Sequence, residues 1–372
     1  MEEIKILQVL NSLGRGGIES FITGVYNYID KSKVQFDFCI CQGKETDHLD
    51  EVKKLGANVF FYPRFSPKNF FKFISWWKKF FSEHSEYKII HAHVRSIAYF
   101  YLTQAHKKGL KTILHSHNTS SNSQVGKFAN LIRTYLLNKI KNSNFIDYRF
   151  ACSQDAGEWL FGKKSDFKVI HNGIETDKFK YNAFIRDEYR TKLGIENNFV
   201  IGHVGNGTEQ KNHFFILKVF KEVLKNCSNA KLLLIGKLDR IEKEISSFIE
   251  EHNLQENILI LGVRDDVHNL LQAMDVFIFP SLYEGLGIVA IEAQCSGLPV
   301  ICSDRIPLET KITDNIEYIS LDESIETWEQ HILAYYDKKD REDCSLQCKQ
   351  AGYDIQQIAI DLEKFYKDIY IK

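Results

Sequence analysis

Residues 280–304 have the sequence Pro-Ser-Leu-Tyr-Glu-Gly-Leu-Gly-Ile-Val-Ala-Ile-Glu-Ala-Gln-Cys-Ser-Gly-Leu-Pro-Val-Ile-Cys-Ser-Asp, which indicates an α/β fold. The apolar run Val276–Phe279 stops at Pro280, as in a buried strand that ends at its carboxyl edge. We expect a helix from about Ile288 to Ser296-Gly297 and a further strand over Leu298–Cys302. A helix that starts where a parallel strand ends presents free N–H groups and a positive dipole end. Open α/β sheets bind anionic ligands at such positions.

Two glycines and two glutamates lie at this predicted crevice. Gly285 and Gly287 would let a ligand approach the backbone closely. Glu284 and Glu292 would lie roughly 12 Å apart at about 1.5 Å rise per residue. That separation suits the two ends of one extended ligand better than a pair of carboxylates sharing a proton. The alternative is an ordinary strand–helix turn with surface acids.

The segment resembles the E-x7-E segment of retaining GT-B glycosyltransferases of family 4. The resemblance rests on Glu284-Gly-Leu-Gly, Glu292-Ala, Gly297-Leu-Pro-Val-Ile and Ser303-Asp304. It implies that Glu284 and the stretch Gly285, Leu286 and Gly287 contact the donor sugar, and that Glu292 holds the ribose hydroxyls. It also implies a GT-B fold, in which two Rossmann-like parallel-sheet domains face each other across a cleft and the C-terminal helix crosses back to the first domain.

Apolar runs predict strands throughout the chain, with helices between them. They are Ile4–Leu10, Phe36–Cys41, Asn58–Tyr62, Lys88–His93, Thr112–Asn118, Phe199–Val204, Lys231–Gly236, Asn257–Gly262 and Asp275–Pro280. Asn172-Gly173 resembles the family's linker between domains. We therefore predict an acceptor-binding domain over 1–170, joined by a helix within 353–372, and a nucleotide-sugar-binding domain over 171–352.

A glycine-rich loop follows the first predicted strand. The order strand, loop with Gly16 and Gly17, helix is suited to phosphate binding, because glycines expose backbone N–H groups. The loop resembles the family's Gly-Gly-x-Glu loop. This implies that Gly16 and Gly17 approach the donor diphosphate, and that Glu19 lies in the acceptor cleft. The spacing is not G-x-G-x-x-G, so a nicotinamide-dependent dehydrogenase is not expected.

Two predicted strands end in His-x-His, with His91 and His93 on one and His115 and His117 on the other. Four histidines suggest zinc, but no H-E-x-x-H pattern supports it. The family resemblance implies instead that His117 bonds the donor sugar beside the reacting carbon and that His93 lies in the cleft. Structural burial is the alternative, and it is strongest for His91 and His115.

The cations expected at the donor diphosphate are incomplete. The family carries an arginine and a lysine after the first strand of the second domain, and this chain has Asn206 and Lys211 at those positions. The site would therefore bind diphosphate less strongly or use another cation, with Arg15, Arg264 and Arg305 as candidates. Arg264 also lies where the family's base-contacting loop is expected. The chain contains no Asp-x-Asp sequence, so no metal is expected at the diphosphate.

The composition excludes some classes of partner. The net charge of −1 argues against nucleic acid, although residues 1–171 carry +10 and the remainder −11. The start of the chain has no basic region that predicts a signal peptide, so we expect a cytoplasmic protein with eight reduced cysteines. Cys39-x-Cys41 and Cys344-x3-Cys348 are isolated pairs, which more often fill cores than bind zinc.

Two segments combine apolar or aromatic residues with lysines. They are Lys68–Tyr87 and Lys127–Lys141. Rings and lysines on one helix suit the interface of an anionic membrane, so peripheral attachment to the inner face of the cell membrane is one hypothesis. The other hypothesis is a helix packed on a sheet with lysines on its outer face, and we favour a core position for the aromatics.

The resemblance extends through nearly the whole chain and is closest to the exopolysaccharide, capsule and O-antigen branch of the family. It implies a retaining transferase that moves a hexosyl or N-acetylhexosaminyl group from a nucleotide sugar, most simply a UDP-sugar, to a growing lipid-linked saccharide. Lys211, Glu284 and His117 would be the catalytic residues. The alternatives are a nucleotide-sugar 2-epimerase of GT-B fold and a non-catalytic scaffold of a polysaccharide assembly complex.

Overall fold

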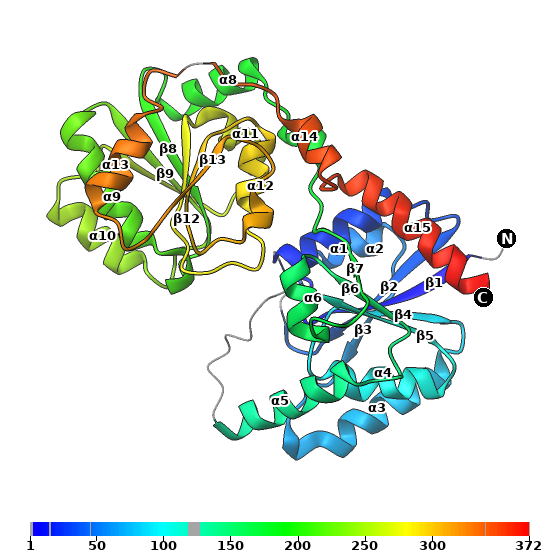
Figure 1. The fold of residues 1–372 in the computed structure, drawn as a ribbon. Coiled ribbons are helices and arrows are strands. Elements are labelled where there is room, and N and C mark those ends of the chain that lie inside the picture. Colours follow the sequence, from blue (N-terminus) through cyan, green and yellow to red (C-terminus); the bar gives the residue numbers. More distant parts are fainter. Residues whose placement is uncertain (1–2, 15, 45, 118–126, 339, 372) are drawn as a thin grey trace. The chain divides into compact units, whose positions relative to one another are not determined.

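The structure is a computed structural model that describes residues 3–14, 16–44, 46–117, 127–338 and 340–371 of the chain. It divides into two compact units (Figure 1). Unit 1 comprises residues 1–174 and 352–372, and unit 2 comprises residues 175–351. The chain therefore crosses between the units after Ile174 and again after Ala351, within a few residues of the positions expected from the sequence.

Unit 1 is built on one parallel seven-stranded sheet in the order β3-β2-β1-β4-β5-β6-β7. Its first five strands lie within or beside the predicted runs, which confirms them. The strands are β1 (Ile4–Val9), β2 (Val34–Cys41), β3 (Val59–Tyr62), β4 (Ile89–Ala92), β5 (Lys111–Ser116), β6 (Tyr148–Ala151) and β7 (Lys168–Val169).

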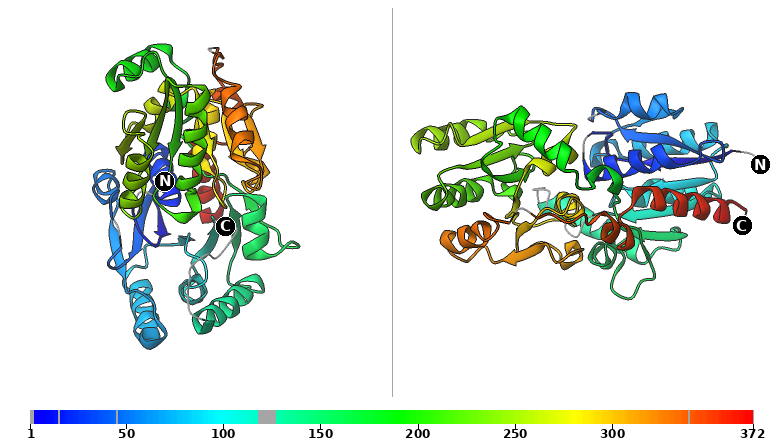
Figure 2. Two further views of the ribbon diagram at one scale, coloured as in Figure 1. Left: turned by 90° about the vertical axis from the view of Figure 1, so that its left-hand side faces the viewer. Right: turned by 90° about the horizontal axis from the view of Figure 1, so that it is seen from above.

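Helices cover both faces of this sheet (Figure 2). One core holds side chains of α1 (Gly17–Tyr28), α2 (Leu49–Lys54) and α15 (Ile355–Ile371). The other core holds side chains of α3 (Phe70–Glu83), α4 (Ala98–Lys107), α5 (Lys127–Lys141) and α6 (Gln154–Phe161). Alternate strand residues face alternate cores, so Ile4 and Ile6 contribute to the first and Leu7 and Val9 to the second.

The C-terminal helix α15 returns to unit 1, as the resemblance implies. Ile358, Leu362 and Tyr366 of this helix are buried in the same core as Phe36 of β2. The edge of the Phe36 ring meets the Tyr366 ring at 5.8 Å between centroids. The backbone of Ile174 also pairs with Asp354 in a parallel bridge. The two crossing segments are therefore joined at the point where the chain leaves unit 1.

Unit 2 contains a parallel six-stranded sheet in the order β10-β9-β8-β11-β12-β13. Its strands are β8 (Phe199–Val204), β9 (Ala230–Ile235), β10 (Ile258–Gly262), β11 (Val276–Phe279), β12 (Val300–Ser303) and β13 (Ile316–Ile319). Its helices are α7 (Thr176–Phe179), α8 (Ala183–Leu193), α9 (His213–Asn226), α10 (Glu242–Glu251), α11 (Val267–Ala273), α12 (Ile288–Cys295), α13 (Ile325–Leu333) and α14 (Ser345–Gln350). The predicted helix from Ile288 is confirmed, and it ends before Gly297, whose φ of 67° stops it.

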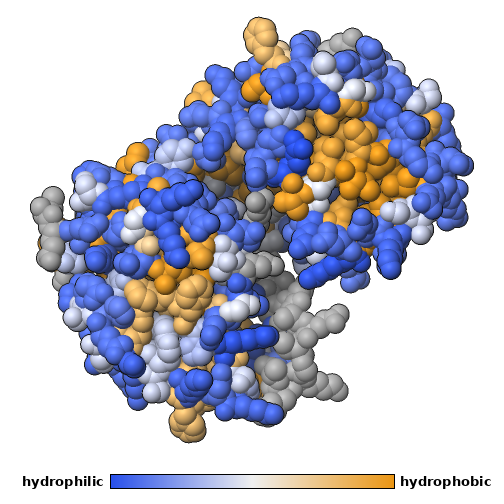
Figure 3. Space-filling model, turned by 180° about the vertical axis from the view of Figure 1, so that it is seen from behind, coloured by the Kyte–Doolittle hydropathy of each residue, from blue (hydrophilic) through white to orange (hydrophobic). Residues whose placement is uncertain are grey.

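The aromatic helix α3 is mostly a core helix, as favoured from the sequence. Phe73, Trp77, Phe80 and Phe81 are buried, whereas Phe71 is 85% exposed. Hydrophobic side chains also reach the molecular surface of each unit among hydrophilic ones (Figure 3). Among the described residues, no helix has the length and apolar character needed to span a membrane.

The eight cysteines are all free and buried. Cys39 and Cys41 lie on β2 and pack into the core beneath α3 and α4. The sequence expectation that these residues fill cores is confirmed.

Candidate functional site

Both sheets are parallel, so the loops that follow the strands of each unit gather along one edge of its sheet. In unit 2 this edge brings together Lys211, after β8, and Glu284, after β11. Nζ of Lys211 lies 2.7 Å from Oε1 of Glu284, and the two side chains are 18% and 9% exposed. Lys211 also lies over the Phe279 ring, 4.8 Å from its centroid. Two of the predicted catalytic residues thus form one ion pair.

Hydrogen bonds connect the loop that carries Lys211 to the loop that carries Glu284. The Leu282 N–H donates to the Gln210 carbonyl at 2.8 Å, and the Gln210 side chain donates to the Tyr283 carbonyl at 2.9 Å. The Asn212 amide donates to the Pro280 carbonyl at 3.2 Å. Lys211 therefore sits between two residues fixed to the Glu284 loop, which limits its freedom to leave the carboxylate.

The turn before α12 has the geometry expected of a backbone ligand site. Gly287 has a φ of 79°, and an added Cβ would lie 3.0 Å from the Phe279 ring, so glycine is favoured there for both reasons. The Leu286 side chain is buried, and its carbonyl accepts a hydrogen bond from the Thr310 hydroxyl. The turn is thus anchored at Leu286, between Gly285 and Gly287. The N–H of Ala290 donates to the Gly287 carbonyl at 2.9 Å, whereas those of Ile288 and Val289 precede the first helical hydrogen bond.

Glu292 lies on α12 and differs electrostatically from Glu284. Its side chain is half-buried, and desolvation raises its pKa to about 7. No hydrogen bond or ion pair within the described residues offsets this loss of hydration. A carboxyl in this state gains most from a ligand that donates hydrogen bonds to it.

Asn206 and Arg264 occupy the same edge but have partners of their own. Oδ1 of Asn206 accepts from the backbone N–H of Lys237 at 3.1 Å, which ties the loop after β8 to the loop after β9. Arg264 makes two hydrogen bonds to Asp266, at 2.8 and 2.6 Å. This pair lowers the pKa of Asp266 to about 2. The Arg264 guanidinium is therefore paired with the Asp266 carboxylate in this structure.

Of the other cations considered for the diphosphate, the structure describes only Arg305. Arg305 is 48% exposed and lies 3.9 Å from Asp322. Arg15 lies outside the described residues.

In unit 1 the glycine loop lies between β1 and α1, as predicted. Gly16 caps α1, and Gly17 is the first residue of the helix. An added Cβ on Gly16 would meet a Glu19 carboxylate oxygen at 2.4 Å, whereas Gly17 has open space at that position. Oε1 of Glu19 accepts from the Ser12 hydroxyl, so the carboxylate is held against its own loop.

The predicted histidines form a buried hydrogen-bonded chain. Nδ1 of His93 lies 2.9 Å from Nε2 of His117, and Nδ1 of His117 lies 2.9 Å from Oδ1 of Asn172. At the other end, Nε2 of His93 lies 2.9 Å from Oε1 of Gln8. Burial lowers the pKa of His117 to about 4 and that of His93 well below its ordinary value. Both rings are therefore neutral at physiological pH, and in a chain of two neutral rings one of the terminal amides, Gln8 or Asn172, presents its NH2 group to the adjacent ring nitrogen.

Sequence reasoning missed the partners that orient these side chains. Gln8 lies in a strand that is otherwise mostly apolar. A polar side chain in a buried strand indicates that a hydrogen-bond partner is needed, so this residue could have been singled out. Asn172 was interpreted only as part of the linker between domains. Tyr366 could not be placed, because its hydroxyl meets His91 at 2.7 Å across 275 residues of sequence.

Comparison with known proteins agrees with this architecture. Residues 15–178 match the model for Glycosyltransferase Family 4, and residues 185–353 match the model for Glycosyl transferases group 1. EpsF of Bacillus subtilis, named as a glycosyltransferase, is 32% identical over 95% of this chain and 94% of its own length.

Two further relatives have more specific names. The UDP-Gal:alpha-D-GlcNAc-diphosphoundecaprenol alpha-1,3-galactosyltransferase of Escherichia coli is 28% identical over 73% of this chain and 72% of its own. The capsular polysaccharide biosynthesis glycosyltransferase CapH of Staphylococcus aureus is 27% identical over 81% of each chain.

A solved structure shows the same fold. HepE of Anabaena, crystallised with UDP, superposes with a TM-score of 0.77 at 18% identity over 99% of this chain and 100% of its own. A match of each unit to a glycosyltransferase model, together with a near full-length relative, establishes the family. The chain belongs to the family 4 glycosyltransferases of GT-B fold, among relatives named for the synthesis of surface polysaccharides.

Proposed function

We propose that this glycosyltransferase moves a hexosyl or N-acetylhexosaminyl group from a UDP-sugar to a growing, lipid-linked saccharide of a bacterial surface polysaccharide, with retention of anomeric configuration. The ion pair between Lys211 and Glu284, set beside the glycine turn that opens α12, carries the proposal. The names of the relatives support the donor and acceptor, because one uses UDP-galactose and a diphosphoundecaprenol-linked acceptor.

Charge on the departing nucleotide would be stabilised by unit 2. Lys211 supplies a cation, and the N–H groups of Gly285, Leu286 and Gly287 supply dipoles where negative charge develops. Glu284 would position Lys211 and accept hydrogen bonds from hydroxyl groups of the sugar. Glu292 would accept hydrogen bonds from the ribose hydroxyls. The chain has no Asp-x-Asp sequence, so we propose that transfer needs no metal at the diphosphate.

Unit 1 would supply the remaining contacts. His117 is neutral and oriented by Asn172, and a hydroxyl of the donor sugar near the reacting carbon would replace the contact of its Nε2 with His93. The amides of Gly16 and Gly17 would approach the diphosphate, and Glu19 and His93 would line the acceptor side.

Peripheral binding to an anionic membrane surface is the finer part of the proposal. Phe71 on α3 and Leu131 on α5 are 85% and 69% exposed, and Lys68 and Lys72 near Phe71 are exposed as well. Exposed apolar side chains beside lysines favour an interface with anionic lipid, where a lipid-linked acceptor would be found.

A thermal-shift screen of UDP, GDP, ADP and their sugars tests the donor class, because a ligand that binds only the folded state raises its melting temperature. We expect a shift with UDP compounds that does not need magnesium and is lost in Glu292→Ala. Glu250→Ala, an exposed glutamate on α10, is the matched control and should keep it. No shift with any nucleotide would contradict the proposal and favour the non-catalytic scaffold. Release of UDP from the donor sugar in the absence of any acceptor would favour the epimerase.

A further inference from the structure

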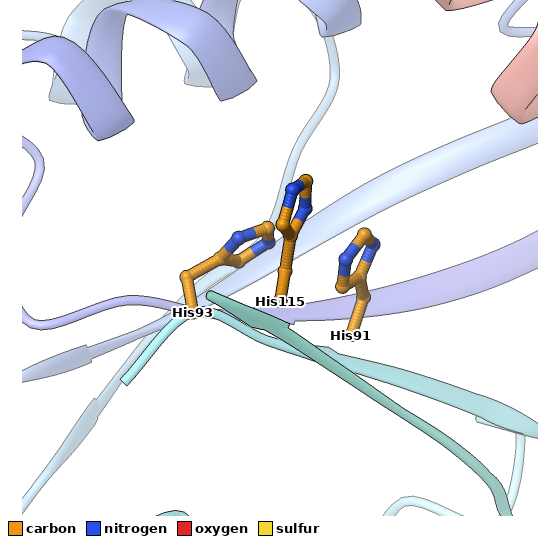
Figure 4. Close-up of side chains that lie close together, drawn as sticks. All are labelled: His91, His93 and His115. Carbon is orange, nitrogen blue, oxygen red and sulfur yellow. The ribbon is translucent and has the colours of Figure 1, made fainter. Parts of the chain in front are cut away.

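Four imidazoles lie on one face of the unit 1 sheet, at the carboxyl ends of two neighbouring strands. β4 and β5 are parallel neighbours, and the histidines are alternate residues on each, so all four rings share a face. One ring nitrogen from each of His91, His93 and His115 lies within 4.8 Å of the other two, and the three side chains are buried. Figure 4 shows the three rings standing together above the strands.

Several of these nitrogens have no hydrogen-bond partner in the part of the chain that the structure describes. They are Nε2 of His91 and the two ring nitrogens of His115, which lack well-aligned partners, although one nitrogen of His115 lies near the Ile170 backbone. A buried polar group without a partner has lost its hydration without a hydrogen bond in return, which destabilises the fold. The edge of the His115 ring faces Phe21 and Phe150, at 6.0 and 5.8 Å between centroids. An apolar side chain at position 115 would pack beside these two rings without leaving a buried polar group unsatisfied. The unpartnered nitrogens therefore point to a ligand that would engage them.

Hydrogen bonds from residues outside the cluster already orient two of the rings. Nδ1 of His91 lies 2.7 Å from the Tyr366 hydroxyl, and Nε2 of His93 lies 2.9 Å from the Gln8 carbonyl oxygen. Histidines that bind metals commonly donate their other ring N–H to such an oxygen, which fixes the tautomer. Donation in this sense leaves Nε2 of His91 and Nδ1 of His93 with free electron pairs. Nδ1 of His93 now contacts His117, and a metal would replace that contact.

We propose that His91, His93 and His115 bind one transition-metal ion of the kind that prefers imidazole, for which Zn²⁺ is the probe. Zinc–nitrogen bonds of about 2.1 Å in a tetrahedron place ligand nitrogens about 3.4 Å apart, so ring rotations that close at most about 1.4 Å complete the site. The fourth position is open to water or an anion, which offsets part of the charge.

This site goes beyond the proposed transfer reaction and can be tested without it. All three ligands come from β4, β5 and the residue after β4, and only His93 is also proposed for the acceptor side. The ion would hold the ends of the two strands and would not bridge the diphosphate. Its removal should therefore leave the UDP-induced shift in melting temperature in place.

Metal retention is the direct test. The full chain is stripped with EDTA, loaded with Zn²⁺, passed through a desalting column and assayed by mass spectrometry. We expect one ion per chain in the wild type and in the control His106→Gln, an exposed histidine on α4. His91→Gln and His115→Gln should retain only background zinc. No retained zinc in the wild type, equal retention in the cluster variants, or loss in His106→Gln would overturn the site.

A second measurement needs no substitution and covers variants that fold poorly. Loading the wild type with Co²⁺ should give the visible absorption of a tetrahedral site, and Zn²⁺ should abolish it. Zinc should also shift the imidazole ¹⁵N resonances of His91 and His115 and leave His106 unchanged. Absence of both responses would contradict the proposal, whatever the behaviour of the variants.

Discussion

Nζ of Lys211 lies 2.7 Å from Oε1 of Glu284, and hydrogen bonds from the residues on either side of Lys211 fix this cation to the Glu284 loop. The pair is electrically neutral before any donor arrives. It therefore supplies a diphosphate with a positioned lysine, while the carboxylate remains close to the place proposed for the sugar.

Separate substitutions of this pair distinguish stability from binding. Lys211→Met leaves a nearly buried carboxylate without its cation, and we expect a loss of about 2–4 kcal/mol in the free energy of unfolding. Adding Glu284→Leu should recover much of that loss, yet transfer should stay at least about 100-fold below the wild type, because the cation is still missing. Urea unfolding and donor turnover measure the two effects. Recovery of turnover in the double variant would contradict the role of Lys211.

Glu292 should make donor affinity depend on pH. Desolvation raises its pKa to about 7, and the ionised form accepts hydrogen bonds better from ribose hydroxyls. Affinity for a UDP-sugar, whose diphosphate does not titrate in this range, should rise as the pH increases through about 7. Calorimetry between pH 5.5 and 8.5 measures it, and Glu292→Gln should bind weakly and independently of pH. The same pH slope in both proteins would refute the assignment.

Ionisation of Glu292 should change the free energy of unfolding in the opposite direction to donor affinity, lowering it as the pH rises. The folded-state pKa of Glu292 lies above its ordinary value, so the ionised form is penalised by folding. Its contribution to the free energy of unfolding is fully present below about pH 4.5 and is lost as the pH rises through 7. Glu292→Gln should remove this part of the pH dependence in urea unfolding.

Burial lowers the pKa of His117, and the hydrogen bond to Asn172 opposes that shift. In Asn172→Asp a carboxylate replaces the amide oxygen 2.9 Å from Nδ1, and we expect the pKa of His117 to rise from about 4 by roughly 2 units or more. NMR titration of the ring carbons measures it. Asn172→Ala removes the hydrogen bond without adding charge and should not raise the pKa. An unchanged titration in Asn172→Asp would show that the two side chains are not in contact.

Asn206→Arg should strengthen diphosphate binding. The side chain at 206 is exposed on the edge that carries Lys211, so an added guanidinium can reach the phosphates, and a charged hydrogen bond contributes about 1.5–3 kcal/mol. We expect UDP to bind at least about tenfold more tightly, with a steeper salt dependence. Asn206→Gln is the neutral control. Equal affinity in all three proteins would place the diphosphate away from residue 206.

Membrane binding should depend on the exposed residues of unit 1. Phe71→Ser with Leu131→Ser removes two exposed apolar side chains, so folding should be unaffected and co-flotation with anionic liposomes should fall about tenfold. Phe184→Ser, at an 86% exposed phenylalanine on α8 of unit 2, is the matched control and should still float. Flotation of all three proteins alike, or of none at low salt, would rule out this surface.

Most of the fold could be predicted from the sequence, because apolar runs and glycine stops determine local structure. The strand Val276–Phe279 and the helix from Ile288 are examples, since Pro280 and Gly297 mark their limits. Strand β13 was not predicted, because Glu317 interrupts its short apolar run. In the structure the Glu317 carboxylate forms hydrogen bonds with His331 and Tyr335, which follow it in the chain. Only the tertiary structure shows these partners.

The candidate site could be predicted only in its residue types. Sequence patterns named Lys211 and Glu284, but their pairing depends on the parallel order of β8 and β11. Arg264 was named as a candidate cation for the diphosphate, and its pairing with Asp266, two residues away, is seen only in the structure. The bond between Gln8 and Tyr366 joins residues 358 positions apart, which no local pattern can reveal.

Transfer of label from a UDP-sugar tests the central claim most directly. The wild type is incubated with ¹⁴C-labelled UDP-hexoses or UDP-N-acetylhexosamines and with lipid extracts that contain diphosphate-linked saccharides. We predict that one donor moves label into the lipid phase, with equal release of UDP and an α-configured linkage in the product. Glu284→Gln should fail to do so, and the exposed control Glu250→Ala should succeed. A β-linked product would contradict retention, and the absence of UDP release with every donor would contradict transfer from a UDP-sugar.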